Sequence, residues 1–329
     1  MDIEALETGQ LITDAVFLVA EAKLQVDRRG EKYYALTLNA EGGRQVDAKV
    51  WGDNVSAAIE AGKGIEVLAR VDEYRARKQL NIQRYRMLPP AEFDSTTYVR
   101  TTEIDVDAAF ETLFNWDKAE FSNRYFKRLL AELHGNEGFA AQFKESPAAK
   151  RHHHNYRGGL IEHTLEVWKL ADSASRAHGG PFDRELLLCG AALHDIGKVK
   201  TYSLTAGISE RTEAGELLDH IFISGSMMSN LWDSVVRPAV PPDKAEEAAR
   251  LKGLLLHIIL SHHGRYEWGS PVVPRTPEAL LVHFCDQISS TLHTCFTAIR
   301  GAAPGEVWTE DVYIMDQARR LFVWPQREA

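Results

Sequence analysis

Seven histidine and aspartate residues recur on apolar, helix-like segments in the second half of the chain. They are His163, His194, Asp195, His220, His262, His263 and Asp286. Imidazole and carboxylate together suit Mn, Fe, Zn or Ni, whereas an all-oxygen set would suit Mg or Ca. A lone histidine on a helix is more often solvated or hydrogen-bonded than a ligand, which is how we interpret His134, His178 and His293; His257 fits the core or a supporting position. Recurrence over five successive segments predicts a metal centre.

The adjacent pair His194 and Asp195 restricts the geometry of such a centre. Neighbouring side chains diverge by roughly 100° on a regular helix. They can therefore share one centre only near a helix end, and Gly197 provides that end.

The elements that position these residues are predicted to be helices. From residue 107 onward, apolar residues repeat three and four apart. The helical segments read DAAFETLFNW, FSNRYFKRLLAELH, GGLIEHTLEVWKLADSASRAH, RELLLCGAALHDIGK, EAGELLDHIFISGSMMSNLWDSVV, KAEEAARLKGLLLHIILSHH, TPEALLVHFCDQISSTLHTCF and EDVYIMDQARRLF. We expect an all-α domain over residues 107–329.

The first ninety residues show strand-like patterns instead of helical ones. LITDAVFLVAEAKLQV, KYYALTLNA, RQVDAKVWG, IEVLARVDEY and QLNIQRYRML read as strands, and NVSAAIEAG as a short helix before the fourth. Three strands, a helix and two strands is the order of an OB-fold barrel. We expect an all-β OB-fold domain over residues 1–90, closed by Pro89-Pro90, and a linker over residues 91–106.

The motifs around the histidines resemble a known family. HHNYRGGLIEHT, LHDIGKV, TEAGELLDHI and SHHGRYEWGSP occur in order behind the OB-like region. This pattern resembles the HD-domain metal-dependent phosphohydrolases and, more specifically, the YhaM-type 3′-to-5′ exoribonucleases, over nearly the whole chain. Asp219 is a departure, because the resemblance leads us to expect glycine before the histidine.

The resemblance implies ligand roles. One metal would be held by His163, His194, Asp195 and Asp286. Asp195 would bridge to a second metal held by His220, His262 and His263; a one-metal alternative keeps only the first four residues. Two cations ~3.5–4 Å apart suit in-line displacement at phosphorus. Manganese is the first choice of metal, with Fe, Ni or Co as alternatives.

Other motif residues are weaker candidates. Lys198 is placed to neutralise a phosphoryl oxygen, or is simply a lysine at a helix end. His154, and less so His153, could contact the phosphate or protonate the leaving oxygen. The Gly158-Gly159 pair could admit a phosphate to backbone N–H groups or only form a turn. His283 lies on the same helical face as Asp286 and could support the metal site, although a core histidine is the favoured interpretation. Glu267 and Trp268 could shape the substrate entry or simply form a surface loop.

The OB-like region carries a candidate nucleic-acid surface. Strand alternation puts Tyr33 on the same face of the sheet as Lys49 and Trp51, and such aromatics stack on bases of single strands. Residues 63–86 hold seven basic against three acidic residues. The basic candidates in this run are Arg75, Arg77, Lys78 and Arg84. Trp51 could equally pack under the linker or the helical domain.

Composition limits the function classes. The chain has 329 residues, 44% hydrophobic and 26% charged, which predicts a globular protein of two or three domains. Its net charge of −9 makes it a poor general binder of polyanions, so a nucleic-acid substrate requires the local basic run or bound cations. Three cysteines, an N-terminus without a signal-peptide pattern and no apolar run of ~18 residues argue against a disulfide scaffold, secretion and a membrane span. We expect a cytoplasmic protein.

Three functional hypotheses follow. The first is a metal-dependent 3′-to-5′ exoribonuclease acting on single-stranded RNA, and on single-stranded DNA as an open alternative, to release nucleoside 5′-monophosphates. The second is a nucleotide phosphohydrolase or cyclic-nucleotide phosphodiesterase, which would have no need of a strand-binding groove. The third is a nucleic-acid-binding protein without catalysis, against which the complete ligand set argues. A homo-oligomer is compatible with all three.

Overall fold

The computed structural model describes residues 6–55, 57–74, 77–118, 121–150, 154–205, 207–302 and 305–324. Its contacts divide the chain into two compact units. The first comprises residues 1–102 with 204–210, and the second comprises residues 103–203 with 211–329. Each unit has its own hydrophobic core.

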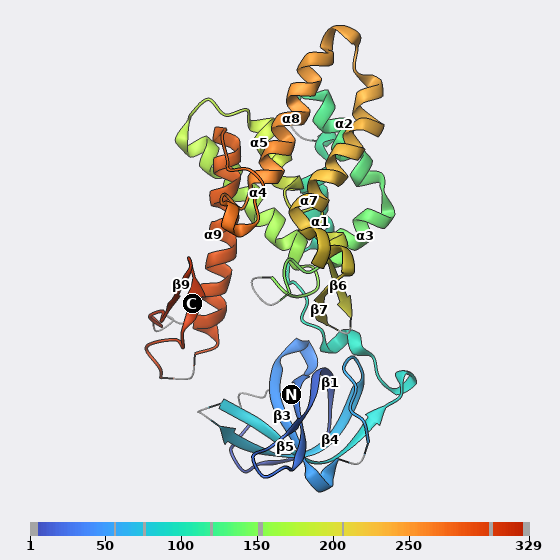
Figure 1. Cartoon of the computed structure of the whole chain (residues 1–329), viewed down its shortest axis with the longest axis vertical. Coiled ribbons are helices and arrows are strands. Elements are labelled where there is room, and N and C mark those ends of the chain that lie inside the picture. Colours follow the sequence, from blue (N-terminus) through green and yellow to red (C-terminus); the bar gives the residue numbers. More distant parts are fainter. Residues whose placement is uncertain are drawn as a thin grey trace. The chain divides into compact units, whose positions relative to one another are not determined.

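The first unit is a closed five-stranded barrel (Figure 1). Its strands are β1 Leu11–Val26, β2 Lys32–Asn39, β3 Gln45–Trp51, β4 Gly64–Tyr74 and β5 Arg77–Leu88. They neighbour one another in the order β1-β2-β3-β5-β4, and β1 closes the barrel against β4. β3 and β5 run parallel and the other pairs antiparallel. This topology is the OB-fold, as the strand order predicted.

Alternation of side chains explains how the barrel fills. In β3, Val46, Ala48 and Val50 are buried while the residues between them point outward. β1 is long enough to pair with β2 along its second half and β4 along its first, and its register shifts between Ile12 and Ala15 and again between Val19 and Glu21. Such bulges bend a strand, which closes the sheet on itself.

The helix predicted over NVSAAIEAG is wrong. In the described part of this segment, a single 3₁₀ turn, η2 Gly52–Asn54, is followed by irregular chain. The hydroxyl of Tyr85 accepts a hydrogen bond from Ala57 N at 2.8 Å and donates one to Ala57 O. Side-chain partners thus replace the backbone bonds of a helix at this position, and Ile59 is buried in the barrel core.

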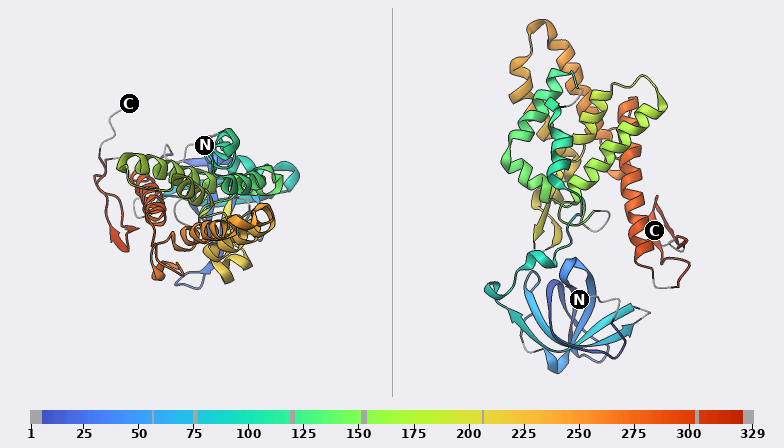
Figure 2. Two further views of the ribbon diagram at one scale, coloured as in Figure 1. Left: turned by 90° about the horizontal axis from the view of Figure 1, so that it is seen from above. Right: turned by 180° about the vertical axis from the view of Figure 1, so that it is seen from behind.

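The second unit is mainly helical. Its helices are α1 Val106–Phe114, α2 Arg124–Gly135, α3 Glu137–Glu145, α4 Gly159–His178, α5 Arg184–Leu193, α6 Lys198–Thr201, α7 Glu213–Leu231, α8 Ala245–Ser261 and α9 Pro277–Arg300. α4 packs against α1, α5 and α9, and α8 packs against α5, α7 and α9 (Figure 2). Side chains cap several of these helices; Asp105, for example, accepts hydrogen bonds from the first turn of α1.

Short helical turns connect the longer elements. They are η1 Glu41–Gly43, η3 Pro90–Glu92, η4 Ser95–Tyr98, η5 Trp116–Lys118, the π-turn η6 Trp232–Val236, η7 Arg237–Ala239, η8 Pro242–Lys244 and η9 Tyr266–Trp268. η3 and η4 fall largely within residues 91–106, the predicted linker, where the sequence shows no regular spacing of apolar residues.

The helix predicted over EDVYIMDQARRLF is also wrong, because this segment forms a hairpin. β8 Val312–Ile314 pairs antiparallel with β9 Gln317–Arg319. Met315 and Asp316 between them both have positive φ, as a two-residue hairpin turn requires. A second hairpin, β6 Tyr202–Thr205 with β7 Ile208–Arg211, follows α6. Among the helices of the described ranges, none is both long and apolar enough to cross a membrane.

Candidate metal centre

Five elements bring the seven predicted ligands together. α4 carries His163, α7 carries His220 and α9 carries Asp286, while the turns that end α5 and α8 carry the other four. Six of the seven side chains are buried and His263 is half-buried. Residues more than 120 positions apart thus converge in the core of the helical unit.

The first group of candidate ligands gathers around His163. His163 Nε2 lies 3.1 Å from Asp286 Oδ1, 3.4 Å from His194 Nε2 and 3.4 Å from Asp195 Oδ2. His194 Nε2 is 3.2 Å from the same Asp195 oxygen. The ligand atoms of His163, His194 and Asp195 all lie within 4.8 Å of one another, and Asp286 adjoins them through its contact with His163.

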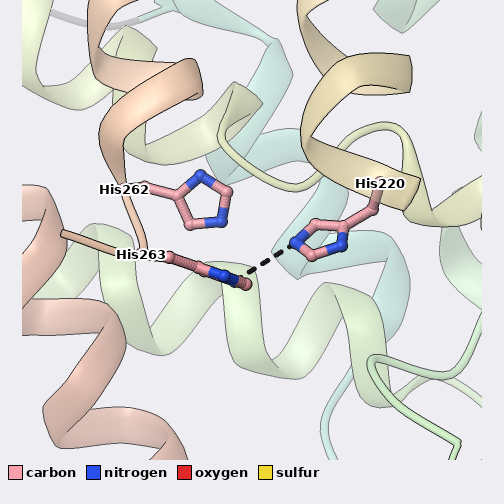
Figure 3. A group of neighbouring side chains, drawn as sticks. All are labelled: His220, His262 and His263. Atoms are coloured by element: carbon pink, nitrogen blue, oxygen red, sulfur yellow. Dashed lines mark hydrogen bonds between the residues drawn. The ribbon is translucent and has the colours of Figure 1, made fainter. Parts of the chain in front are cut away.

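The second group lies on the other side of Asp195. His220 Nε2 is 3.2 Å from His263 Nε2, and Figure 3 shows these two rings meeting beside His262. Asp195 Oδ1 lies 3.5 Å from His220 Nε2 and 3.6 Å from His262 Nε2. One carboxylate oxygen faces each group, which is the bridging position that the resemblance implied for Asp195.

These separations fit bound cations. Two ligands ~2.1 Å from one ion are about 3.0 Å apart at a right angle and about 3.4 Å apart at the tetrahedral angle. Within the described part of the chain, Asp195 Oδ1 and His262 Nε2 are buried without a hydrogen-bond partner. A buried unpaired acceptor is costly, and a cation between these atoms would satisfy both.

The other ring nitrogen of these histidines, Nδ1, takes part in a hydrogen bond within the protein. Nδ1 of three histidines donates to a backbone carbonyl at 2.6–2.8 Å; these are His194, His262 and His263. His163 Nδ1 is 3.0 Å from Ser289 Oγ, and the Ser289 hydroxyl donates to Glu166. Because a carbonyl oxygen only accepts, these bonds place the ring proton on Nδ1 and leave the Nε2 lone pair facing the centre.

Burial and neighbouring charges shift the pKa values of the residues in this centre in opposite directions. Burial favours the neutral acids, but Lys198 and the histidines hold the pKa of Asp195 well below its ordinary value, and His163 does the same for Asp286. Burial lowers the pKa of His220 and lowers that of His262 further. Burial also acts against a charged His163, yet hydrogen bonds with Asp195 and Asp286 raise its pKa to about 8.

Lys198 belongs to this cluster. It is buried at the start of α6, and its Nζ lies 2.6 Å from Asp195 Oδ2. Lys198 also lies in the last turn of the four-residue α6, as the alternative from the sequence predicted. Its ammonium is the positive side chain nearest the bridging carboxylate in the described structure.

Gly197 serves close packing more than helix termination. A Cβ on Gly197 would lie 2.5 Å from Ser224 N and 2.6 Å from His220 O, and Gly197 N donates to Ser224 Oγ. The turn that carries His194 and Asp195 can therefore touch α7 directly at His220.

Asp219, where glycine was expected, interrupts α7 with φ 59° and ψ 160°. This region is essentially restricted to glycine. The Asp219 carboxylate accepts hydrogen bonds from Nδ1 and N of His220, and from Arg211 Nη2 at 3.2 Å.

The loop before α4 forms a buried polar network. His154 is fully buried, with its Nδ1 2.9 Å from Tyr156 Oη and its Nε2 3.4 Å from Glu166 Oε2. Its ring packs on that of His293, whose Nε2 lies 3.3 Å from Tyr156 Oη, within the prediction of a solvated or hydrogen-bonded histidine. His154 therefore lies beside His163 within the protein and away from the solvent surface, and His153 lies outside the described residues.

Glycine is required in this loop for conformational reasons. Gly158 has φ 78°, and a Cβ on Gly159 would lie 2.0 Å from the carbonyl oxygen of His154. The turn interpretation accounts for both residues.

The loop after His263 supports the second ligand group. Trp268 O accepts the hydrogen bond from His263 Nδ1, and Glu267 beside it is exposed. His283 Nδ1 lies 2.8 Å from His262 O, and a Cβ on Gly264 would collide with the His283 ring. His283 thus supports the backbone of a ligand.

Sequence reasoning missed several residues that support the ligands. Tyr156, Glu166, Ser289 and His293 connect the ligand His163 to the loop before α4. Ser289 shares a helical face with Asp286, three positions earlier on α9, and this spacing is the signal that could have found it.

The barrel brings three of the predicted nucleic-acid residues together. The rings of Tyr33 and Trp51 stack with centroids 4.6 Å apart, and Lys49 Nζ lies 5.8 Å and 5.4 Å from those centroids. The β2–β3 register places Tyr33 opposite Trp51.

The basic candidates described in the structure lie on β5, which pairs with β3, the strand of Lys49 and Trp51. Arg84 is exposed on β5, and Lys78 lies opposite Glu73 near the β4–β5 turn. Arg75 and the side chain of Arg77 lie outside the described residues. Arg86, in the same basic run, pairs with Glu66 and Glu92.

The helical unit contains an HD domain, since the HD domain family model matches residues 160–291, the span from α4 to α9 that includes all seven predicted ligands. An HD domain implies dependence on a divalent metal. The chain is 30% identical over 315 residues to the 3′-5′ exoribonuclease YhaM of Bacillus velezensis, covering 94% of both chains. The chain belongs to the YhaM 3′-5′ exoribonuclease family.

Further relatives and one solved structure were also matched. Identity is 28% to YhaM of Bacillus subtilis over 94% of both chains, and 29% to YhaM of Listeria innocua over 96% of this chain and 95% of the relative. Among solved structures, the second OB-fold domain of replication protein A from Methanococcus maripaludis matches 27% of this chain and 93% of its own, with 15% identity and a TM-score of 0.22.

Proposed function

We propose that this chain is a metal-dependent 3′-to-5′ exoribonuclease that shortens single-stranded RNA and releases nucleoside 5′-monophosphates. The observation that carries the proposal is Asp195, whose two oxygens face two separate groups of histidine nitrogens, in a chain of the YhaM family. Such an arrangement suits two cations acting on one phosphodiester.

The proposed centre would take two divalent ions. His163, His194, Asp195 and Asp286 would hold the first, and the histidines of the second group would hold the other together with Asp195. The mixed nitrogen and carboxylate set favours manganese, with Fe, Ni or Co as alternatives. A single ion on the first four residues is the competing arrangement.

When bound, the ion pair supplies Lewis acidity for in-line attack of water on the terminal phosphodiester. The protein residues prepare this step. Hydrogen bonds at Nδ1 fix the histidine rings so that their Nε2 atoms face the centre. Lys198, whose ammonium lies at the bridging carboxylate, neutralises a non-bridging phosphoryl oxygen as charge develops.

His154 has a supporting part in this proposal. With its ring buried and connected through Glu166 and Ser289 to His163, it orients a ligand and does not contact the phosphate.

The barrel is proposed to capture the strand. Tyr33 and Trp51 offer a stacked aromatic surface beside the Lys49 ammonium, which suits unpaired bases and a phosphate. We assign strand binding to residues 1–90, a linker to residues 91–106 and hydrolysis to residues 107–329. The preference for RNA over DNA is taken from the relatives' name, and a cellular RNA substrate implies work in the cytoplasm.

A homo-oligomer is supported by the solvent face of α9. Five apolar side chains spaced four residues apart are 43–56% exposed there, and α9 packs on α4, α5 and α8 through its other side. They are Leu280, Phe284, Ile288, Leu292 and Phe296. Because an apolar strip of this length is unusual on a monomer, we propose that a second copy covers it. Sedimentation analysis that finds only monomers at micromolar concentration would contradict this.

The substrate class can be tested with the purified full chain and manganese. Equal amounts of single-stranded RNA, single-stranded DNA, nucleoside triphosphates and cyclic nucleotides are incubated separately, with Asp195→Ala as the inactive control. We expect RNA to be shortened fastest and the nucleotides to stay intact. Faster hydrolysis of triphosphates or cyclic nucleotides would overturn the proposal in favour of a small-molecule phosphohydrolase.

A further inference from the structure

Asp219 has a backbone conformation that does not suit an aspartate. With φ 59° and ψ 160°, it interrupts α7 immediately before the proposed ligand His220. A Cβ is strained in this region, where glycine is the residue that is normally tolerated. Interactions of the carboxylate must therefore offset the strain.

Both carboxylate oxygens of Asp219 have specific partners. Oδ1 accepts from Nδ1 of His220 and from its backbone N. Oδ2 accepts from Arg211 Nη2 at 3.2 Å, and Arg211 Nη1 donates to Gly215 O at 3.3 Å. Arg211 thus connects the first turn of α7 to the carboxylate that holds the histidine ring.

His220 differs from the other four proposed histidine ligands in this partner. Three of those rings donate Nδ1–H to a backbone carbonyl and one to a serine hydroxyl, whereas His220 donates to an ionised carboxylate. An aspartate carboxylate is ionised at neutral pH, and Asp219 Oδ1 accepts both bonds from His220. A carboxylate on Nδ1 fixes the tautomer and orientation of the ring and makes Nε2 a stronger donor to a metal.

We propose that Asp219, held by Arg211, is a positioning residue that orients His220 and strengthens binding of the divalent cation in the His220, His262 and His263 group. This inference rests on the proposed two-ion function. It assigns to the strained aspartate a gain in metal affinity that glycine at the same position would not provide.

A purely structural role predicts the opposite behaviour. If Asp219 only shaped the kink, glycine would fit the same φ and ψ better and would leave the metal site intact. Asp219→Gly therefore separates the two explanations, because it relieves the strain and removes the carboxylate at once.

The test is a manganese titration of the metal-free full chain, with bound ions counted by equilibrium dialysis and elemental analysis. We expect two ions in the natural protein. In Asp219→Gly, affinity for one ion should fall by about 10–100-fold while the other is unchanged. Asp219→Asn keeps an acceptor oxygen without the charge and should fall between the two, and Arg211→Gln should give a smaller loss.

Two further readouts exclude misfolding. The melting temperature of metal-free Asp219→Gly should not fall below that of Asp219→Asn, because glycine tolerates the backbone. Nitrogen NMR of the His220 ring should report the Nδ1–H tautomer in the natural chain and a mixture of tautomers in Asp219→Gly.

Two outcomes are decisive and distinct. Two ions bound with unchanged affinity in both Asp219 variants would overturn the positioning role and leave the proposed function standing. A natural chain that binds only one ion, with Asp195→Ala losing it, would remove the two-ion premise itself.

Discussion

Lys198 Nζ lies 2.6 Å from Asp195 Oδ2, the oxygen that also faces His163 and His194. The ammonium and a cation of the first group therefore share one carboxylate oxygen. A positive side chain here opposes metal binding and favours an anionic substrate. We therefore assign Lys198 a role in the reaction and not in metal binding.

Lys198→Gln should accordingly lower kcat without loss of metal. Removing a group that stabilises the transition-state charge costs about 10²–10³ in kcat, while manganese content should stay the same or rise. Lys200→Gln, an exposed lysine on the same short helix, is the control and should behave like the natural chain. Loss of manganese from Lys198→Gln alone would show that the lysine organises the ligands.

Removal of the Asp195 side chain is expected to release more metal ions than removal of any other proposed ligand. Asp195→Ala should lose both ions because each carboxylate oxygen serves a different group. Asp286→Ala and His263→Ala should each lose only one. Elemental analysis after dialysis at fixed free manganese distinguishes these cases, and a single ion lost from Asp195→Ala would refute the bridge.

The raised pKa of His163 gives a test by pH. In the metal-free chain its folded pKa is about 8, above the unfolded value of ~6.5. The associated stability is fully present below pH 6.5 and lost as pH rises through about 8. The melting temperature of the metal-free protein should therefore fall between pH 7 and pH 9.

Manganese should act in the opposite direction over the same range. A metal must displace the His163 proton below about pH 8, so the manganese-induced rise in melting temperature should grow with pH. A rise that is independent of pH between 7 and 9 would mean that His163 is not a ligand.

Base stacking at Trp51 can be separated from charge attraction. Trp51→Ala should weaken binding of single-stranded RNA by ~1–3 kcal/mol with little change in salt dependence. Lys49→Ala should reduce the slope of log affinity against log salt by about 0.7. Trp51→Phe, which keeps a stacking ring, is the control. If Trp51→Ala binds RNA as the natural chain does, the tryptophan only packs on Tyr33.

The five strands could be predicted from stretches that alternate buried and exposed residues, as in β3, although β1 buries four residues in succession, Phe17 to Ala20. Sequence patterns could not show that the helix predicted at residues 54–62 fails to form, because the hydrogen bonds between Tyr85 and Ala57 involve a strand distant in the sequence. The β8–β9 hairpin was missed because its turn residues, Met315 and Asp316, carry no glycine or asparagine signal.

The candidate ligands could be proposed from residue type and helix position. Their orientation could not, since the partners of the ring nitrogens include Trp268 O and Ser289, which are set by tertiary packing. Asp219 is the most instructive case. The expectation of glycine has a physical basis in its φ of 59°, and only the contacts with His220 and Arg211 explain an aspartate there.

The direction and product of cleavage test the account most directly. Single-stranded RNA labelled at its 5′ end is incubated with the full chain and manganese, products are separated by size, and released units are identified by mass. In-line attack of water that expels the 3′ oxygen predicts a descending ladder of labelled RNA and nucleoside 5′-monophosphates, with neither formed by Asp195→Ala. Immediate release of labelled mononucleotide, or 2′,3′-cyclic phosphate products, would contradict it.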